Sequence, residues 1–234
     1  MPSQTYLVIG ASRGIGYGLV EQLSGDSSNK VIATVRKPFD FGKSNIETLV
    51  LDQSSTSSVQ AAASKLSTPV DTLILNAAIG LDEALLSTTE DRLHEYMNTN
   101  ILGVQRVVNA FLPALRKGTA KKIVIITSYS GSNTAQRGAE FGFRGPYAVT
   151  KAANNMQAVQ LHNELRGEGF VVAPVHPGWV ATDMGSLAIN DRVPEGVKPM
   201  PVEDSAAGLI KVIDGLTTED SGKFWGFDGS SMAW

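Results

Sequence analysis

Short apolar runs alternate with longer stretches of helical period along the whole chain. The short runs, rich in Val, Ile and Leu, predict strands at residues 6–9, 31–35, 48–51, 72–75, 122–127, 170–175 and 223–227. Between them, apolar residues at helical spacing predict helices at residues 16–23, 57–66, 89–115, 147–166 and 205–215. Nearly continuous apolar strands separated by helices are typical of a parallel sheet covered on both faces. With right-handed crossovers, the pattern predicts an α/β fold with a doubly wound, Rossmann-type parallel sheet.

Two segments break this alternation. Residues 131–146 are rich in Gly, Arg and Phe, and residues 185–201 contain three prolines. Both follow strands, at the edge where open α/β sheets bind ligands. We expect them to be loops that wall a substrate site rather than surface excursions. No repeat, low-complexity tract or linker divides the chain, so residues 1–234 are expected to form one domain.

The composition excludes several classes of protein. The net charge of −3 makes neither nucleic acid nor an anionic membrane an expected partner. Lys121 and Lys122 precede an apolar strand, where we expect both to be solvated. Cysteine is absent, which excludes disulfides and thiolate nucleophiles, and the three histidines lack metal-ligand spacing, so no metal site is predicted. Without a signal peptide or an apolar segment near the ~20 residues that span a bilayer, the sequence predicts a soluble, cytoplasmic protein.

A glycine-rich turn follows the first predicted strand. Gly10, Gly14 and Gly16 lie where this strand turns into the first helix. Glycine permits the tight turn and lets the backbone approach a pyrophosphate, while the start of the helix offers free N–H groups to the phosphates. This position between a strand and a helix predicts a dinucleotide-binding loop.

The end of the second strand indicates which dinucleotide binds. Folds that prefer NAD usually carry an Asp or Glu about 20 residues after the glycines. Here the strand is followed by Arg36 and Lys37, with no acid. A guanidinium can bind the 2′-phosphate of NADPH through two hydrogen bonds, and Arg13 is placed to approach the same phosphate from the other side. The sequence therefore favours NADPH over NADH, against the alternative of solvated surface cations.

Tyr147 and Lys151 lie four residues apart at the head of a predicted helix, and hence on one face of it. The preceding strand ends in Ser128, so both hydroxyl groups can face the cofactor. This set suits the reduction of a carbonyl, because the phenol can donate a proton to the oxygen while Ser128 stabilises the developing charge. An unperturbed phenol has a pKa of about 10. We expect the Lys151 cation, with the positive charge of oxidised nicotinamide when it is present, to lower the pKa of the phenol.

With these motifs in this order, the sequence resembles the short-chain dehydrogenase/reductase family over essentially its full length. The matching residues are Gly10, Ser12, Arg13, Gly14, Ile15, Gly16, Asp52, Asn76, Ala77, Asn100, Ser128, Tyr147, Lys151, Pro177, Gly178, Val180 and Thr182. Leu75 and Ala78 depart from the Asn-Asn-Ala-Gly element of the family. The tail, residues 222–234, resembles that of C-factor and sniffer-type carbonyl reductases and of norsolorinic acid ketoreductases.

The resemblance implies roles for the residues of the catalytic and adenine regions. Asp52 would contact the adenine, and Asn76 and Ala77 would belong to the cofactor site. Lys151 would hydrogen-bond the nicotinamide ribose. Asn100 would hold a water that relays protons from solvent to Lys151.

The same resemblance implies a nicotinamide site and an assembly. Pro177 and Gly178 would form a turn around the nicotinamide, and Thr182 with the backbone near Val180 would fix its carboxamide. A homodimer or homotetramer would form around the two long predicted helices, residues 89–115 and 147–166.

The leading expectation is an NADPH-dependent reductase of a ketone or aldehyde. One alternative is a biosynthetic enzyme that acts on an imine or uses the bound cofactor to shape a cyclisation pocket. Another is a non-catalytic nicotinamide sensor, which the intact set of reactive residues disfavours. Trp179, Phe141 and Phe143 are expected either to line the substrate pocket or to pack a loop, and Asp183 is expected to cap a helix.

Overall fold

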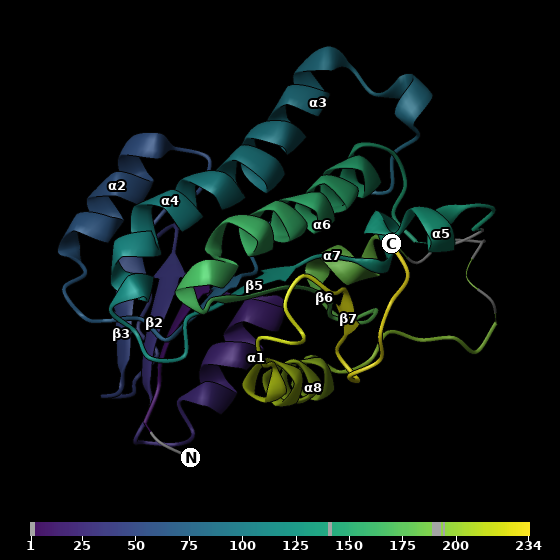
Figure 1. Cartoon of the computed structure of the whole chain (residues 1–234). Helices are drawn as coiled ribbons and strands as arrows, with labels where there is room; N and C mark the ends of the chain where they lie inside the picture. The colour runs from purple at the N-terminus through teal and green to yellow at the C-terminus, as the bar shows by residue number, and fades with distance from the viewer. Residues whose placement is uncertain (1–2, 140–141, 189–192, 194) are drawn as a thin grey trace.

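The computed structural model describes residues 3–139, 142–188, 193 and 195–234. Within them, a seven-stranded sheet, parallel throughout, forms the centre of the molecule (Figure 1), in the order β3-β2-β1-β4-β5-β6-β7. The strands are β1 (Thr5–Ile9), β2 (Lys30–Val35), β3 (Ile46–Val50), β4 (Thr72–Leu75), β5 (Lys122–Ile126), β6 (Val171–His176) and β7 (Trp225–Gly226). The order reverses between β1 and β4, which is where open α/β sheets bind ligands. The predicted fold class is confirmed.

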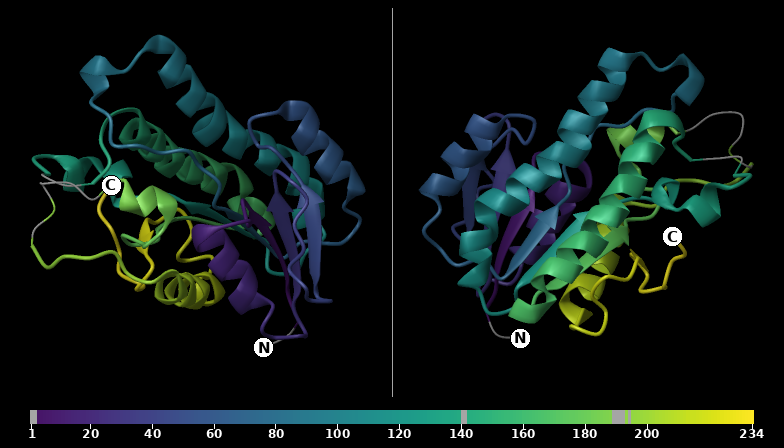
Figure 2. Two further views of the ribbon diagram at one scale, coloured as in Figure 1. Left: turned by 180° about the vertical axis from the view of Figure 1, so that it is seen from behind. Right: turned by 45° about the horizontal axis from the view of Figure 1, so that its top comes forward.

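Helices cover both faces of the sheet (Figure 2). On one face lie α2 (Thr56–Lys65), α4 (Gly103–Arg116) and α6 (Gly145–Leu165), and on the other α1 (Gly14–Leu23) and α8 (Val202–Gly215). Strand β1 shows how the sequence produces two cores, since Leu7 and Ile9 pack on the first face while Tyr6 and Val8 pack on the second. Within the described chain, no helix is long and apolar enough to cross a membrane.

The predicted helix over residues 89–115 is continuous but not uniform. It comprises α3 (Glu90–Tyr96), the π-helical segment η2 (Met97–Leu102) and α4. Such segments are rare and frequently lie at functional sites. Here the segment contains Asn100, which is 1% exposed.

The two segments predicted as loops contain short helices. Residues 131–146 include α5 (Asn133–Gln136), and residues 185–201 overlap the end of α7 (Asp183–Ser186). The remaining short helices are η1 (Leu85–Ser87), η3 (Tyr129–Gly131) and η4 (Arg166–Glu168). Residues 140–141, 189–192 and 194 of the predicted loops lie outside the described residues. That these segments wall a substrate site stays a prediction.

Lys122 is buried rather than solvated. Its Nζ donates to the backbone oxygens of Ile213 and Asp214, at 2.7 and 2.9 Å, at the end of α8. These are carbonyls that a helix end leaves without intrahelical partners. Burial lowers the pKa of Lys122. The expectation of a solvated strand end is wrong here because a helix terminus, distant in sequence, covers the side chain.

Candidate active site

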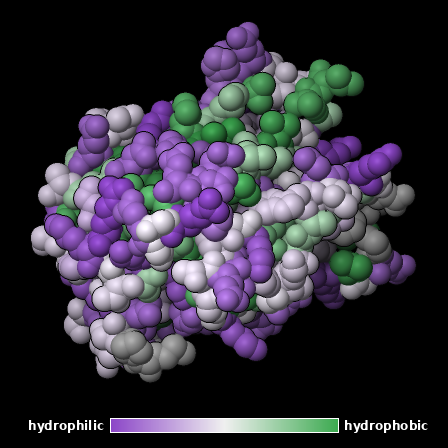
Figure 3. Space-filling view, in the orientation of Figure 1, coloured by the Kyte–Doolittle hydropathy of each residue, from purple (hydrophilic) through white to green (hydrophobic). Residues whose placement is uncertain are grey.

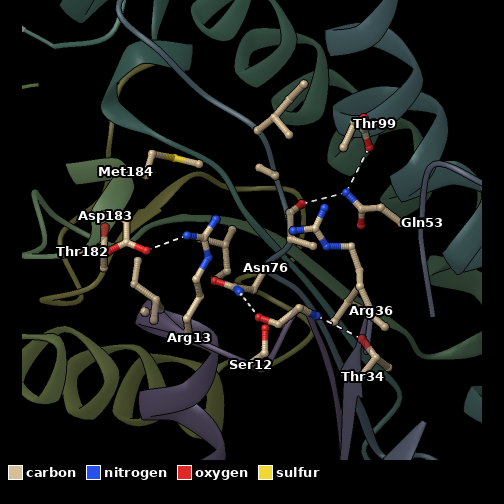
Figure 4. Close-up of a pocket in the computed structure, with 18 of the residues that line it drawn as sticks. Ser12, Arg13, Thr34, Arg36, Gln53, Asn76, Thr99, Thr182, Asp183 and Met184 are labelled. Carbon is tan, nitrogen blue, oxygen red and sulfur yellow. Dashed lines mark hydrogen bonds and ion pairs between the residues drawn. The ribbon is translucent and has the colours of Figure 1, made fainter. Parts of the chain in front are cut away.

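A cavity of about 600 Å³ opens at the carboxyl ends of β1, β4 and β5 (Figure 4). Its volume is typical of small-molecule and cofactor sites. The predicted site residues that line it are Gly10, Ser12, Arg13, Gly14, Ile15, Arg36, Asp52, Asn76, Ala77, Tyr147, Lys151, Pro177 and Thr182. The predicted residues that do not line it are Gly16, Lys37, Asn100, Ser128, Gly178 and Val180.

The glycine loop is packed so tightly that side chains are excluded from it. A Cβ on Gly16 would lie 2.1 Å from the oxygen of Gly10, and one on Gly10 would lie 2.7 Å from the Cβ of Ala77. Gly10 and Gly14 have φ of +80° and +56°, which glycine adopts at little cost. Because α1 begins at Gly14, its free N–H groups lie beside the cavity, and the loop fits the phosphates of a dinucleotide.

Two side chains hold the glycine loop in place. Gly10 donates its N–H to Thr34 Oγ1 at 3.0 Å, and Asn76 Nδ2 donates to the Gly10 oxygen at 2.9 Å (Figure 4). Thr34 was not among the residues predicted for the site, and its only signal in the sequence is a polar residue within an apolar strand. Asn76 therefore positions the loop as well as lining the cavity.

The three cations predicted for the cofactor phosphate occupy different environments. Arg36 and Lys37 are both exposed, but only Arg36 of the two lines the cavity. Arg13 lines the cavity mouth and forms an ion pair of 2.5 Å with Asp183 of α7 (Figure 4). Both side chains of this ion pair are largely exposed, so it holds Arg13 only weakly, and the approach of Arg13 to the cofactor phosphate stays a prediction. The predicted helix cap also moves by one residue, because Thr182, not Asp183, accepts from the N–H of Gly185.

Asp52 lies at the end of β3 beside Arg36. Its Oδ1 accepts hydrogen bonds from the hydroxyl and the N–H of Ser54, at 2.6 and 2.9 Å. The hydroxyl of Ser54 is the main reason that the pKa of Asp52 lies below its ordinary value, and Arg36 lowers that pKa further. Next to it, Gln53 is buried and its Nε2 donates to the oxygens of Ala77 and Thr99. Sequence reasoning did not single out Gln53.

Tyr147 and Lys151 project from the first turns of α6 into the cavity. Ser128, at the end of β5, lies near enough to the Tyr147 hydroxyl to lower its pKa. Lys151 Nζ lies 5.6 Å from the centre of the Tyr147 ring and donates to the oxygen of Ile126 at 2.8 Å. The two side chains are buried, with residue exposures of 8% and 3%. The fold therefore brings the predicted Ser, Tyr and Lys together at one end of the cavity.

Burial determines the pKa values of this pair. It raises the pKa of Tyr147 to about 12, and Ser128 offsets only part of this rise. Burial also lowers the pKa of Lys151 to about 8. Without the cofactor, burial is the largest influence on the phenol, and the expected lowering of its pKa by Lys151 and oxidised nicotinamide stays a prediction.

Asn100 lies behind the cavity wall and connects two of its elements. Its Oδ1 accepts from the N–H of Ile79 and its Nδ2 donates to the oxygen of Ile79, both at 2.9 Å. The same Nδ2 also donates to Thr150 Oγ1 on α6 at 3.0 Å. The backbone oxygen of Asn100 accepts from Asn154 Nδ2. Its predicted role as a water holder stays a prediction.

The turn after β6 presents some predicted residues to the cavity and turns others away. Pro177 and Thr182 line the cavity, while Gly178 packs on Met200 with φ of +84°. The oxygen of Val180 accepts from the N–H of Thr182 at 2.8 Å and so fixes the turn. Met184 of α7 lines the cavity beside this turn, and sequence reasoning did not identify it (Figure 4).

The predicted aromatic residues pack loops. Trp179 Nε1 donates to the oxygen of Gly185 at 2.9 Å. Phe143 is buried and meets the ring of Tyr147 edge-on, with 5.1 Å between ring centres. Phe141 lies outside the described residues.

A doubly wound sheet with a glycine cradle and a tyrosine–lysine pair in one cavity is characteristic of nucleotide-dependent oxidoreductases. Residues 4–192 match the family model described as short chain dehydrogenase, and the chain belongs to this family. It is 34% identical to an uncharacterised oxidoreductase of Schizosaccharomyces pombe, over 98% of each protein. It is 40% identical to C-signal of Myxococcus xanthus, over 71% of this chain and 93% of that protein. The NADPH-bound carbonyl reductase from chicken fatty liver superposes with a TM-score of 0.89 at 29% identity, over all of both chains.

Proposed function

We propose that this protein is an NADPH-dependent reductase that converts a ketone or aldehyde to an alcohol, with Tyr147 as the acid. The observation that carries the proposal is that Tyr147, Lys151 and the glycine cradle line one cavity. The structural similarity to an NADPH-bound carbonyl reductase supports the choice of cofactor and of reaction. Arg36 supports it further, because it lines the cavity where the sequence lacks an acid.

Each reactive residue has a distinct task in this proposal. NADPH, when bound, would supply the hydride for the carbonyl carbon. Tyr147 Oη donates its proton to the carbonyl oxygen as the C=O π bond breaks, which leaves an alcohol and a phenolate. Ser128, beside the Tyr147 hydroxyl, orients the same oxygen and stabilises its developing charge.

Proton supply falls to Lys151. With a pKa of about 8, its ammonium group keeps its proton near neutrality and is acidic enough to return one to the phenolate. Asn100 supports this step by connecting Ile79 to Thr150 of α6, and its role in holding a relay water stays a prediction. Arg36 would bind the 2′-phosphate, and the backbone of the glycine loop would bind the pyrophosphate.

Replacement of Tyr147 tests the proposal directly. Tyr147→Phe keeps the ring that packs on Phe143 but removes the acidic proton. We expect NADPH oxidation with a panel of carbonyl compounds to fall by about 10³-fold or more. NADPH affinity, measured by the fluorescence of the bound cofactor, should change by less than about twofold.

Tyr17→Phe is the matched control, because Tyr17 is on the outer part of α1 and 38% exposed. It should keep the activity of the wild type. Retained activity in Tyr147→Phe would remove Tyr147 as the acid.

A further inference from the structure

Residues 79–83, here called the seat, cross the ring of Tyr147. Gly80 is the point of contact. A Cβ on Gly80 would lie 2.7 and 2.8 Å from Cδ2 and Cε2 of Tyr147, and 3.1 Å from the sulfur of Met184. Contacts below 3.0 Å are not tolerated, so any side chain at position 80 requires the ring or the seat to move.

The backbone of the seat is held on both sides of Gly80. Ile79 is bound through its N–H and its oxygen by the side chain of Asn100. Leu81 donates its N–H to the hydroxyl of Tyr96 at 2.9 Å, and Tyr96 is fully buried. The seat therefore cannot retreat at Gly80 without breaking buried hydrogen bonds.

Two salt bridges hold the other end of the seat. Arg144 pairs with Asp82 at 3.1 Å, and Arg92 pairs with Glu83 at 2.9 Å. Gly145, with φ of +61°, starts α6 so close to the seat that a Cβ would lie 2.2 Å from the oxygen of Glu83. The seat and the helix that carries Tyr147 are thus in contact at two glycines.

Away from the cavity, the ring of Tyr147 is closely packed. Phe143 meets it edge-on, and Tyr96 and Phe143 form one buried cluster with it. Its backbone oxygen accepts from Thr150 Oγ1 at 2.9 Å, and Thr150 is also bound by Asn100. Close-packed interiors yield little to an added methyl group, so a side chain at position 80 would displace the phenol.

We propose that Gly80 is a positioning residue: by lacking a side chain in a fixed seat, it sets the place of the Tyr147 hydroxyl beside Ser128. The proposal rests on the proposed function only in its kinetic part. Gly80 does not line the cavity, so it acts on chemistry through Tyr147 and not through contact with cofactor or substrate.

Gly80→Ala tests the kinetic part. A misplacement of about 1 Å can cost about 10²-fold in rate, and we expect a fall of this order in kcat. The KM for NADPH should stay within about twofold, because the glycine loop and Arg36, which are proposed to bind its phosphates, are not in contact with Gly80. Gly167→Ala is the matched control, since nothing lies within 4 Å of its added Cβ, and it should leave kcat unchanged. An unchanged kcat in Gly80→Ala would overturn the proposal.

Tyr96→Phe provides a second variant that does not depend on the folding of Gly80→Ala. It removes the hydroxyl that holds Leu81 and so loosens the seat. We expect kcat to fall several-fold on its own. Because a loosened seat can yield to a methyl group, adding Gly80→Ala should then cost less than about tenfold. If the losses in kcat caused by Tyr96→Phe and Gly80→Ala simply multiply in the double variant, the two residues do not act through the same segment, which would contradict the proposal.

A spectroscopic readout separates this proposal from the proposed function. In protein labelled at tyrosine ¹³Cζ, the Tyr147 resonance is identified by its loss in Tyr147→Phe. We expect this resonance to shift in Gly80→Ala and to stay in place in Gly167→Ala. If the resonance shifts in Gly80→Ala but the protein has no reductase activity, the proposed function is refuted and the positioning of Tyr147 by Gly80 stands. A resonance that does not move would refute the positioning role of Gly80, whatever the activity.

Discussion

At the scale of single residues, the structure separates cations that are equivalent in the sequence. Arg13, Arg36 and Lys37 were all predicted to meet the cofactor phosphate. In the described part of the chain, Arg36 lines the cavity without a salt bridge, whereas Arg13 pairs with Asp183 and Lys37 does not line the cavity. Sequence spacing gives the strand end but not the direction of the side chain, which depends on α7, 170 residues away.

The first prediction follows from this separation. Arg36→Ala should raise the KM for NADPH about tenfold, because a charge-assisted hydrogen bond contributes about 1.5–3 kcal/mol. The KM for NADH, which lacks the 2′-phosphate, should change little. Steady-state kinetics with both cofactors measures the difference.

Lys37→Ala is the matched control, since it removes the neighbouring cation without touching the cavity. It should leave the preference for NADPH within about twofold of the wild type. An equal loss with both substitutions would show that the cations act only through their summed charge.

The buried pair also predicts a pH dependence. The pKa of Tyr147 is about 12, so the phenol keeps its proton over the working range, whereas Lys151 loses its proton through about pH 8. If Lys151 supplies the proton, kcat/KM for NADPH at saturating carbonyl should be level at low pH and fall as the pH rises through about 8. Initial rates between pH 6 and 10 measure this.

Lys151→Arg is the informative variant for this profile, because a guanidinium stays charged throughout. Its residual activity should remain level through pH 8. A wild-type profile without a fall, or the same fall in the variant, would assign the proton supply to another group.

At the scale of elements, the sequence predicted strands and helices well because each carries its own apolar period. The π-helical segment around Asn100 was not predicted, because it keeps the apolar spacing of the helix on either side. The two-residue β7 is shorter than the predicted run 223–227, because only Trp225 and Gly226 pair in register with β6, opposite Val175 and His176. The burial of Lys122 depends on α8 and is invisible in local sequence.

Asp71 joins three elements at the amino ends of the strands. Burial raises its pKa, but hydrogen bonds from the N–H groups of Thr5, Thr119 and Ala120 and from the Thr119 hydroxyl outweigh this, so the pKa lies below its ordinary value. Asp71→Asn should lower the free energy of unfolding by about 2 kcal/mol at pH 7. Urea unfolding measures this change.

The lowered pKa of Asp71 also determines how the stability of the wild type changes with pH. A carboxyl with a lowered folded pKa adds stability above the unfolded pKa of about 3.9, and that stability is lost as the pH falls through the folded value. The wild type and Asp71→Asn should therefore converge in acid. Glu219→Gln, at an exposed position, is the control and should match the wild type throughout. A constant difference at all pH values would mean that the carboxylate charge is not the cause.

At the scale of the whole molecule, the candidate site was predictable because parallel strands end at one edge of the sheet. Glycines after β1, Ser128 after β5 and the turn after β6 meet there, although they are far apart in the chain. The segments that close the site were less predictable. Their short helices depend on caps from Ser132 and Thr182, and the seat depends on contacts from α3 and α6.

That the protein forms a homodimer or homotetramer stays a prediction, and apolar side chains are exposed on its surface. Leu85 and Leu86 of η1 are 53% and 103% exposed, and Figure 3 shows apolar surface at the end of the molecule where η1 lies. The long helices α4 and α6, around which a homodimer or homotetramer is expected, expose Val149 and Met156 of α6. The mass in solution, measured by light scattering, distinguishes these states.

Transfer of deuterium from NADPH that carries deuterium at both hydrogen positions of nicotinamide C4 tests the central claim most directly. With a carbonyl compound that the enzyme accepts, the account predicts one deuterium on the carbinol carbon of the product in the wild type. It predicts no labelled product in Tyr147→Phe, which should still bind the labelled cofactor. Product formed without the label, or labelled product at an undiminished rate from Tyr147→Phe, would contradict it.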